Sequence, residues 1–449
     1  MPHYHLQHFF VYPVSVYMLY LLLTKYITLG EIGARWVKYT PLALCVLALQ
    51  ALAVWNYSPP DVDIMRHMAV VLTKIVFQWP FLLVYAEFCR FTLQHETSRR
   101  ACMAGFLCTI GLLFALCGIQ GIYLYTGQAQ TALLQELHVY SKNILLCISP
   151  LLEARWKDAI YDFYAQGAYA LTIQRMNGLF EETSVLAAWV ATFFLPFSMG
   201  FLALRTAQTR RAHALGWILS ITLILLLFIA RGTTAMSVGG VALGLLLLGS
   251  LRGRRKVLTL SITGLCLGLC MLIACYVPQV SVFGQARMNI ANIAHLPRLV
   301  IMQDTLDIIT AHPLTGVGRG NFTAHIVEGE RYKARMPHDP ELQGWKQAGS
   351  VPPLSALLGF TVQYGLPLTV FLLGGIARIW FQIYRRYQAQ PTSSFVQYMF
   401  AACSAWCVLA FISSIGSLDM RNPLFCLPLF VFMAVAQHAD VPAEEYHAA

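Results

Sequence analysis

Residues 213–250 read HALGWILSITLILLLFIARGTTAMSVGGVALGLLLLGS, which is two apolar runs joined by a very short turn that contains Arg231. At roughly 1.5 Å per helical residue, each run is about long enough to cross a hydrocarbon layer of roughly 30 Å. Backbone amides and carbonyls in lipid must be satisfied within the segment, so we interpret both runs as helices. The stretch therefore predicts a transmembrane helical hairpin.

Similar apolar runs recur along the whole 449-residue chain, which is 57% hydrophobic and only 12% charged. This composition is far from that of soluble domains. It predicts an all-α polytopic membrane protein with about eleven transmembrane helices. We expect the spans at residues 9–24, 39–55, 68–88, 101–125, 184–204, 213–230, 234–250, 257–278, 362–382, 396–414 and 422–438.

Clusters of basic residues set the expected orientation, because they follow the first, third, fifth, seventh and ninth spans. They are Arg35 and Lys38; Arg90, Arg99 and Arg100; Arg205, Arg210 and Arg211; Arg252, Arg254, Arg255 and Lys256; and Arg378, Arg385 and Arg386. Positive residues favour the cytoplasmic side, so these linkers are expected there. The net charge of +10 is spread over short linkers rather than gathered in one block, which argues against a nucleic-acid partner.

Two long segments without a span are then expected outside the cytoplasm. Residues 126–183 include a stretch that resembles an amphipathic helix lying in the membrane interface. Residues 279–350 form a large loop between the eighth and ninth spans, longer than a connector needs to be. The expected organisation is N-terminal transmembrane helices (1–125), the interfacial segment (126–183), helices carrying the arginine turn (184–278), the large loop (279–350) and C-terminal helices (351–449).

Nearly all of the twelve cysteines lie inside apolar spans, and none lies in residues 279–350. This placement argues against a disulfide framework and against a zinc site. The histidines of the large loop also lack the spacing of a metal site. We therefore expect neither a metal nor another cofactor.

Four arginines are expected to converge at the extracytoplasmic face of the membrane: Arg175, Arg231, Arg298 and Arg421. Ionisable groups at such depth are costly and often mark functional sites, although each arginine can instead reach up to lipid headgroups. Guanidinium groups suit phosphate because their planar fork donates two parallel charge-assisted hydrogen bonds. A cluster of them predicts a site for a lipid-linked diphosphate, where they would stabilise the leaving group without a metal.

Other candidate residues lie near these arginines in the chain. Glu182 starts the fifth span, either as a base for an acceptor hydroxyl or as a charge that favours the helix dipole. Among the histidines of the large loop, His338 is the most plausible acid or base. The segment HPLTGVGRGNF (312–322) is expected to form a helix end, a turn and a glycine loop, in which Gly316, Gly318 and Gly320 allow positive φ and close backbone approach. That segment is either a phosphate cradle or only a turn.

Several motifs resemble one family of membrane proteins. RLVIMQDTLDIITAHPLTGVGRGNF (298–322) resembles the signature of the O-antigen polymerase and ligase superfamily, and VPPLSALLGFTVQYGLP (351–367) resembles the segment that follows its periplasmic loop. RMNGLFEETSVLAAW (175–189) looks like an element of Wzy-type exopolysaccharide polymerases, with Thr183 in place of a usual proline, and ARGTTA (230–235) occupies the position of another family turn.

The resemblance implies transfer of an undecaprenyl-diphosphate-linked glycan to an acceptor sugar hydroxyl at the periplasmic face of a bacterial inner membrane. Arg175, Arg231 and Arg298 would then hold the diphosphate, and Glu182 would be a base or a structural acid. The other candidate substrate-binding residues are Gly316, Gly318, Arg319, His338 and Arg421. A chain-length regulator and a flippase of the same pathway would be partners.

One departure from the family bears on the choice between polymerase and ligase. The ligases carry a histidine eleven residues before the glycine that matches Gly365, and here that position is Leu354. The missing imidazole favours a polymerase of repeat units over a ligase. The third hypothesis, a transporter or flippase of lipid-linked glycan, predicts repeat symmetry and charges near the bilayer midplane. The expected position of the charges at one face favours an enzyme.

Overall fold

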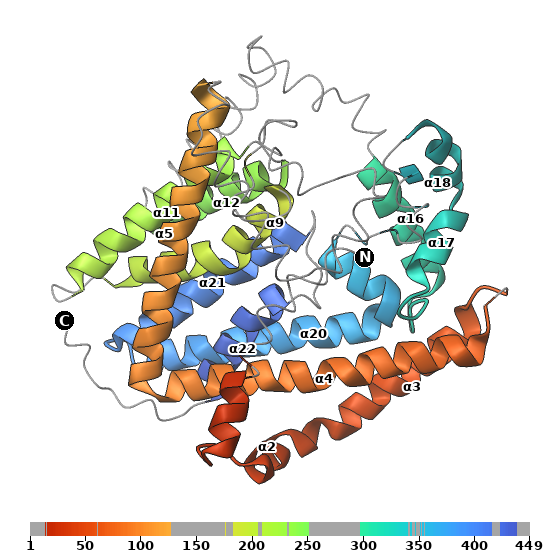
Figure 1. Cartoon of the computed structure of the whole chain (residues 1–449), viewed down its shortest axis with the longest axis horizontal. Coiled ribbons are helices and arrows are strands. Elements are labelled where there is room, and N and C mark those ends of the chain that lie inside the picture. Colours follow the sequence, from red (N-terminus) through yellow and green to blue (C-terminus); the bar gives the residue numbers. More distant parts are fainter. Residues whose placement is uncertain are drawn as a thin grey trace.

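The computed structural model describes residues 14, 16–60, 62–126, 176, 183–204, 209–230, 233–250, 297–339, 342–343, 346, 351, 353, 355–414 and 423–437. Within these residues the regular structure is entirely helical (Figure 1). The elements are α2 (Leu29–Trp36), η1 (Val37–Tyr39), α3 (Thr40–Tyr57), α4 (Ile64–Gln94), α5 (Glu96–Thr126), α9 (Thr183–Trp189), the π-helix η2 (Val190–Phe194), α10 (Leu195–Gly200), η3 (Phe201–Ala203), α11 (Arg210–Ile229), α12 (Thr233–Ser250), α16 (Pro297–Ala311), α17 (Phe322–Glu328), α18 (Glu330–Arg335), η4 (Met336–His338), α20 (Ala356–Ala389), α21 (Ser394–Ser414) and α22 (Pro423–Gln437).

Seven helical stretches in the described residues are long and apolar enough to cross a membrane, and two shorter helices are apolar as well. They coincide with the expected spans from the second to the seventh and from the ninth to the eleventh. The eighth expected span, 257–278, lies outside the described residues, and the first is described only in part. The all-helical membrane architecture is confirmed, and the total of eleven spans stays a prediction.

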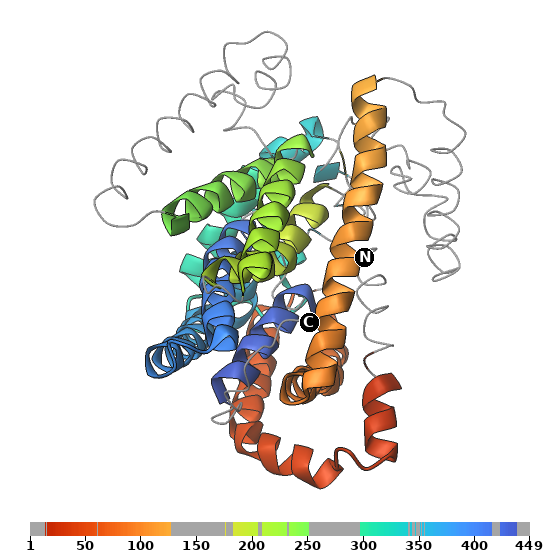
Figure 2. The same cartoon turned by 90° about the vertical axis from the view of Figure 1, so that its left-hand side faces the viewer.

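The largest buried core lies where α10 packs against α21, with α11, α12 and α22 around them. Gly200 of α10 allows this close approach, because a Cβ there would lie 2.8 Å from the Tyr398 ring. Small residues at such crossings let membrane helices pack by van der Waals contact. Helix α4 packs against α3 and α22, and α22 also contacts α20. Helix α5 leaves the end of α4 at a steep angle (Figures 1 and 2).

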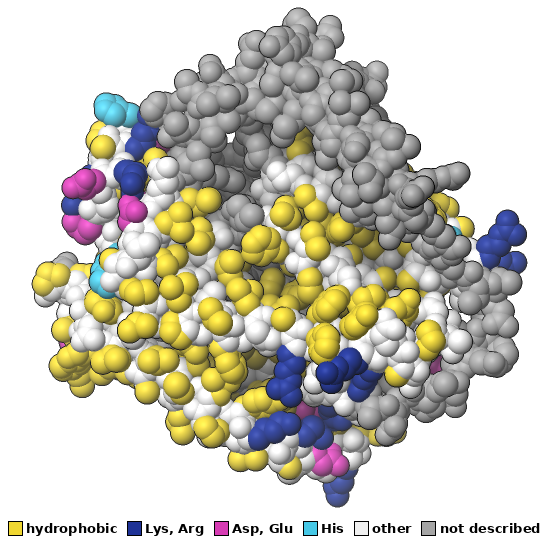
Figure 3. Space-filling model, turned by 180° about the vertical axis from the view of Figure 1, so that it is seen from behind, with side chains coloured by type: hydrophobic (Ala, Val, Ile, Leu, Met, Phe, Trp, Pro, Cys, Tyr) yellow, Lys and Arg dark blue, Asp and Glu magenta, His cyan; other side chains and the backbone are white. Residues whose placement is uncertain are grey.

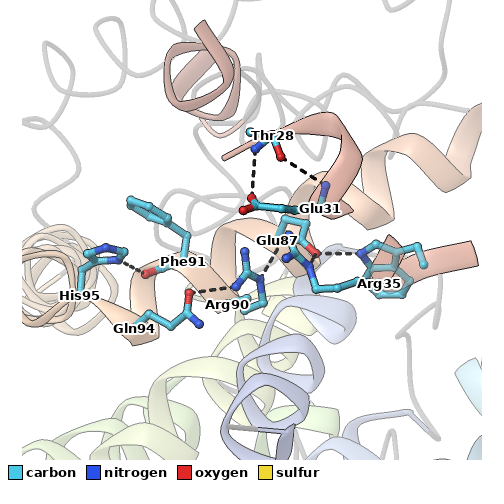
Figure 4. Close-up of polar contacts among 9 residues, drawn as sticks. Thr28, Glu31, Arg35, Glu87, Arg90, Phe91, Gln94 and His95 are labelled. Atoms are coloured by element: carbon cyan, nitrogen blue, oxygen red, sulfur yellow. Dashed lines mark hydrogen bonds and ion pairs between the residues drawn. The ribbon is translucent and has the colours of Figure 1, made fainter. Parts of the chain in front are cut away.

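A buried carboxylate fixes the C-terminal end of α4 (Figure 4). Glu87 is only 2% exposed, and its oxygens accept hydrogen bonds from Arg35 Nη2 at 2.8 Å, Trp36 Nε1 at 2.8 Å and Arg90 Nε at 2.8 Å. Thr28 and Glu31 close the start of α2 with a reciprocal capping box. The contacts join α2 to α4, and both arginines belong to the clusters expected in the cytoplasm.

Apolar side chains cover much of the surface between the charged regions. Figure 3 shows them across the middle of one face, with Lys and Arg side chains gathered along its lower edge. Trp55 of α3, Phe77 of α4 and Phe371 of α20 are each more than half exposed. Apolar patches that extend over several helices are rare on the surface of soluble monomers. A lipid environment would keep these side chains away from water.

We expect Glu87→Gln to destabilise the protein, because two guanidinium groups lose their counter-charge in a largely buried site. The loss should be about 1–3 kcal/mol, since both arginines keep partial access to solvent. It is measured as a lower melting temperature of the detergent-purified protein.

The matched control is Glu96→Gln, which removes an exposed ion pair with Arg100 and should change stability by less than about 0.5 kcal/mol. Equal melting temperatures for the two variants would show that the Glu87 contacts do not hold α2 on α4.

Candidate functional site

Residues 297–339 of the large loop form a folded helical unit packed against the membrane helices. Ile301, Phe322, Ile326 and Tyr332 are all less than 5% exposed and share a core with Val362 of α20. In Figure 1 this unit, α16 to α18, lies beside the start of α20 and near the connection from α3 to α4. The unit therefore occupies one end of the helix bundle.

A break in α20 provides the docking point for this unit. Gly365 has φ +82° and ψ 165°, outside the helical range, and Pro367 follows it. In an unbroken helix the carbonyls of Val362 and Gln363 would accept from the amides of residues 366 and 367. Pro367 has no amide hydrogen, and the Leu366 amide donates instead to the Pro313 carbonyl at 2.7 Å. Two carbonyls of α20 are thus left without their helical donors.

The loop and α3 satisfy both of these carbonyls. The Val317 amide donates to the Val362 carbonyl at 2.8 Å, and Gln50 Nε2 of α3 donates to the Gln363 carbonyl at 2.9 Å. Gln50 Oε1 in turn accepts from the backbone amide of Arg319 at 2.8 Å. Gln50 is fully buried and therefore bridges α3, α20 and the loop.

The glycines of residues 312–322 allow backbone to pack directly on backbone. A Cβ at Gly316 (φ +64°) would lie 2.5 Å from the Val362 carbonyl oxygen, and one at Gly318 (φ +84°) would lie 3.0 Å from Val54 Cγ2. The expected positive φ of these glycines is confirmed, as it is for Gly320. Their nearest described neighbours are the protein's own helices, so the segment is a docking turn, and its contact with substrate stays a prediction.

A second polar contact joins the turn to α4. The side-chain amide of Asn321 donates to the Val317 carbonyl at 2.9 Å, which leaves its Oδ1 to accept from His67 Nε2 at 2.8 Å. Asn321 is 1% exposed. The start of α4 is therefore held against the loop, at the opposite end of that helix from Glu87.

A cleft of about 430 Å³ opens between α16, α17 and α18. Its lining includes Asp304, Asp307, His312, His325, Glu328 and Arg331. Arg331 Nη1 donates to Asp304 Oδ1 at 3.0 Å and also to Asp307. Because the Tyr332 amide donates to the other Asp304 oxygen at 3.1 Å, this carboxylate holds α18 on α16.

Two histidines lie side by side in the cleft, against the end of α3. The rings of His312 and His325 are 5.8 Å apart, and the His312 ring is 4.3 Å from the Tyr57 ring. His325 Nε2 donates to the Tyr57 carbonyl at 3.0 Å. Partial burial, with the neighbouring His325, lowers the pKa of His312 below its ordinary value of about 6.5.

Most of the sequence-predicted site residues are not tested by these contacts. Arg298 is the second residue of α16, but its side chain lies outside the described part of the chain. His338 is exposed on η4 and is not in the lining of the cleft, whereas Arg319 is buried. The remaining candidates, which also lie outside the described residues, are Arg175, Glu182, Arg231 and Arg421.

Sequence reasoning missed three residues that position the loop: Gln50, Tyr57 and His67. The signal for Gln50 was present, since it is a polar residue inside an apolar span, and such residues tend to have partners. Tyr57 is the last residue of α3 and His67 lies in the first turn of α4, so they stand on either side of the connection between these helices. Their partners are more than 250 residues away in the chain, at positions 312, 325 and 321.

We expect Gly365→Ala to disrupt the junction between α20 and the loop. Alanine at φ +82° is strained by about 1–2 kcal/mol, and its Cβ would lie 2.2 Å from the Leu314 carbonyl oxygen. The control is Gly374→Ala on the same helix, where an added Cβ meets no described atom within 4 Å. Thermal unfolding of the two purified variants, and limited proteolysis between α16 and α20, measure the difference. Equal stability would contradict the docking role of Gly365.

Comparison with known proteins identifies the region that contains this site. Residues 217–373 match the family model described as O-antigen ligase. The match begins in α11 and ends in α20 just beyond Gly365, so it includes α16 to α18 and the docking turn. No curated protein matches the chain. This match, which covers about a third of the chain, supports the resemblance to the O-antigen polymerase and ligase superfamily.

Proposed function

We propose that this protein polymerises undecaprenyl-diphosphate-linked oligosaccharide repeat units into an exopolysaccharide or O-antigen chain at the periplasmic face of the inner membrane. The observation that carries the proposal is the O-antigen ligase match over residues 217–373. Members of that family transfer glycans, and the match contains both the arginine turn and the docked loop. The absence of the ligase histidine at Leu354 favours the polymerase.

The two ends of α4 support a sided arrangement. Glu87, with Arg35 and Arg90, lies at its C-terminal end, and His67 contacts the loop at its N-terminal end. Basic clusters favour the cytoplasm, which supports a periplasmic position for the loop end. Lipid-linked repeat units would meet the enzyme there.

The proposed reaction uses the arginines as anion holders. Arg175, Arg231 and Arg298, with Arg421 nearby, bind the diphosphate of the donor through paired hydrogen bonds. The acceptor hydroxyl oxygen attacks the anomeric carbon, and the bond from that carbon to the diphosphate oxygen breaks with its electron pair. The guanidinium groups stabilise the negative charge of the leaving diphosphate. Glu182 is the candidate base that takes the proton of the acceptor hydroxyl; if Glu182 is a structural acid, that proton leaves with the diphosphate.

A ligase that moves a finished glycan onto an acceptor is the second candidate, because the matching family is described as O-antigen ligase. Deletion of the gene and mass spectrometry of the lipid-linked glycans distinguish the two. A polymerase deletion accumulates single repeat units on undecaprenyl diphosphate at the periplasmic face. A ligase deletion accumulates long lipid-linked chains, and a flippase deletion leaves single units facing the cytoplasm. A normal glycan profile would refute the proposed function.

We expect Arg231→Ala to abolish polymer while the protein stays in the membrane at its normal level. Arg231→Lys should also be poor, because an ammonium group does not reproduce the bidentate fork. Polymer length on gels and immunoblots of the membrane fraction measure both effects. Arg100→Ala is the control, since Arg100 is exposed and pairs with Glu96 near the end of α4 that carries Glu87. Normal polymer from Arg231→Ala would remove this residue from the site.

A further inference from the structure

The cleft between α16, α17 and α18 has the wrong charge for a diphosphate. Its lining carries the carboxylates of Asp304, Asp307, Glu328 and Glu330 against one guanidinium, that of Arg331. Arg331 is already paired with Asp304 and Asp307. A diphosphate placed here would face repulsion from like charges. The lipid end of the substrate therefore belongs elsewhere.

The polar groups of the cleft suit the hydroxyl groups of a sugar. Carboxylate oxygens accept hydrogen bonds, and a neutral imidazole accepts one and donates one. The Tyr57 carbonyl can only accept, so Nε2 of His325 carries its hydrogen, and Nδ1 of a neutral ring remains an acceptor. A volume of about 430 Å³ is in the range of small-ligand sites.

The position of the cleft along α16 separates it from the predicted diphosphate site. Arg298 is at the start of the helix, and the lining residues of α16 run from Asp304 to Ala311. At 1.5 Å per residue they lie roughly 9–20 Å from Arg298 along the axis. The bond being made is next to the diphosphate, so a sugar in the cleft is some way along the glycan from that bond.

We propose that this cleft is a glycan-recognition subsite, which binds an internal sugar of the repeat unit through Asp307 and His312 while the diphosphate is held near the start of α16. The proposal rests on the proposed function and deepens it. The subsite supplies binding and specificity for the repeat unit, and it takes no part in bond breaking. An uncharged sugar or an amino sugar fits the negative charge of this cleft, whereas a phosphorylated sugar would be repelled by it.

The test uses the full-length protein in nanodiscs, with lipid-linked repeat units extracted from the deletion strain as substrate. Asp307→Asn and His312→Gln should each raise KM about threefold to tenfold, the value of one hydrogen bond, with kcat nearly unchanged. Asp307→Asn keeps the pair between Arg331 and Asp304, so α18 stays in place. His95→Gln, on an exposed histidine beyond α4, is the matched control.

The outcomes separate this inference from the proposed function. If wild-type protein elongates the repeat units and both variants keep the wild-type KM, the subsite is refuted and the polymerase stands. A fall in kcat at constant KM also refutes it, since His312 would then act in the chemical step. If wild-type protein elongates nothing, the polymerase proposal fails. Saturation-transfer NMR with oligosaccharide freed of lipid then still reports binding to the cleft, and its absence in the wild type refutes the subsite.

Acid should weaken the subsite through His312. The charged or titratable groups that line the cleft with it are Asp304 and Asp307 of α16, which ends one residue before His312; His325 and Glu328 of α17; and Glu330 and Arg331 of α18. Because burial and the neighbouring His325 lower the pKa of His312, the ring is neutral near pH 7 and becomes protonated only at a more acidic pH than an ordinary histidine. KM should rise as the ring becomes protonated in the wild type, and His312→Gln should flatten the rise. An unchanged pH dependence in that variant would exclude His312 from the subsite.

Discussion

The arrangement of this protein depends on the hydrogen bonds that satisfy a broken helix. Breaking α20 at Gly365 within apolar surroundings leaves backbone carbonyls without donors, and each unsatisfied group costs several kcal/mol in lipid. The Val317 amide and the Gln50 side chain supply the two donors. The break is therefore stable only with the loop docked on it and α3 beside it, so three segments far apart in the chain form one unit.

The same junction positions the cleft. Residues 312–322 leave α16, contact α20 and α3, and return into α17, which brings His325 back beside His312. The ends of α3 and α4 complete the contact through Tyr57 and His67. The docking turn, residues 312–322, therefore forms a rigid connection between a membrane helix and the loop. A phosphate cradle is not needed to explain its three positive φ values.

The sequence predicted the elements of this fold better than their contacts. Apolar runs located α3, α4, α11, α20 and α21, because length and hydropathy alone identify a helix that crosses lipid. The break was not predicted, since the expected ninth span, 362–382, includes both Gly365 and Pro367. Nothing in one sequence says which donor reaches a carbonyl from position 50, 313 residues away. The sequence alone favours His338 among the loop histidines, because it does not show that the chain reverses after Pro313. That reversal places His312 beside His325, whereas His338 is exposed on η4. The convergence of the four arginines stays a prediction, since their side chains lie outside the described residues.

Charge along α16 gives the proposed substrate a direction. The start of a helix carries partial positive charge and its end partial negative charge, so an anion is favoured at the first turn. Arg298 adds to that preference, whereas Asp304 and Asp307 add negative charge toward the second half of the helix. Both effects place a lipid diphosphate toward residue 298 and neutral sugar toward residue 311. A glycan bound the other way would bring its diphosphate against carboxylates and carbonyl ends, so one orientation on α16 is strongly preferred. In the proposed function, this preference would distinguish the lipid-linked end of a repeat unit from its sugars without recognition of the lipid chain itself.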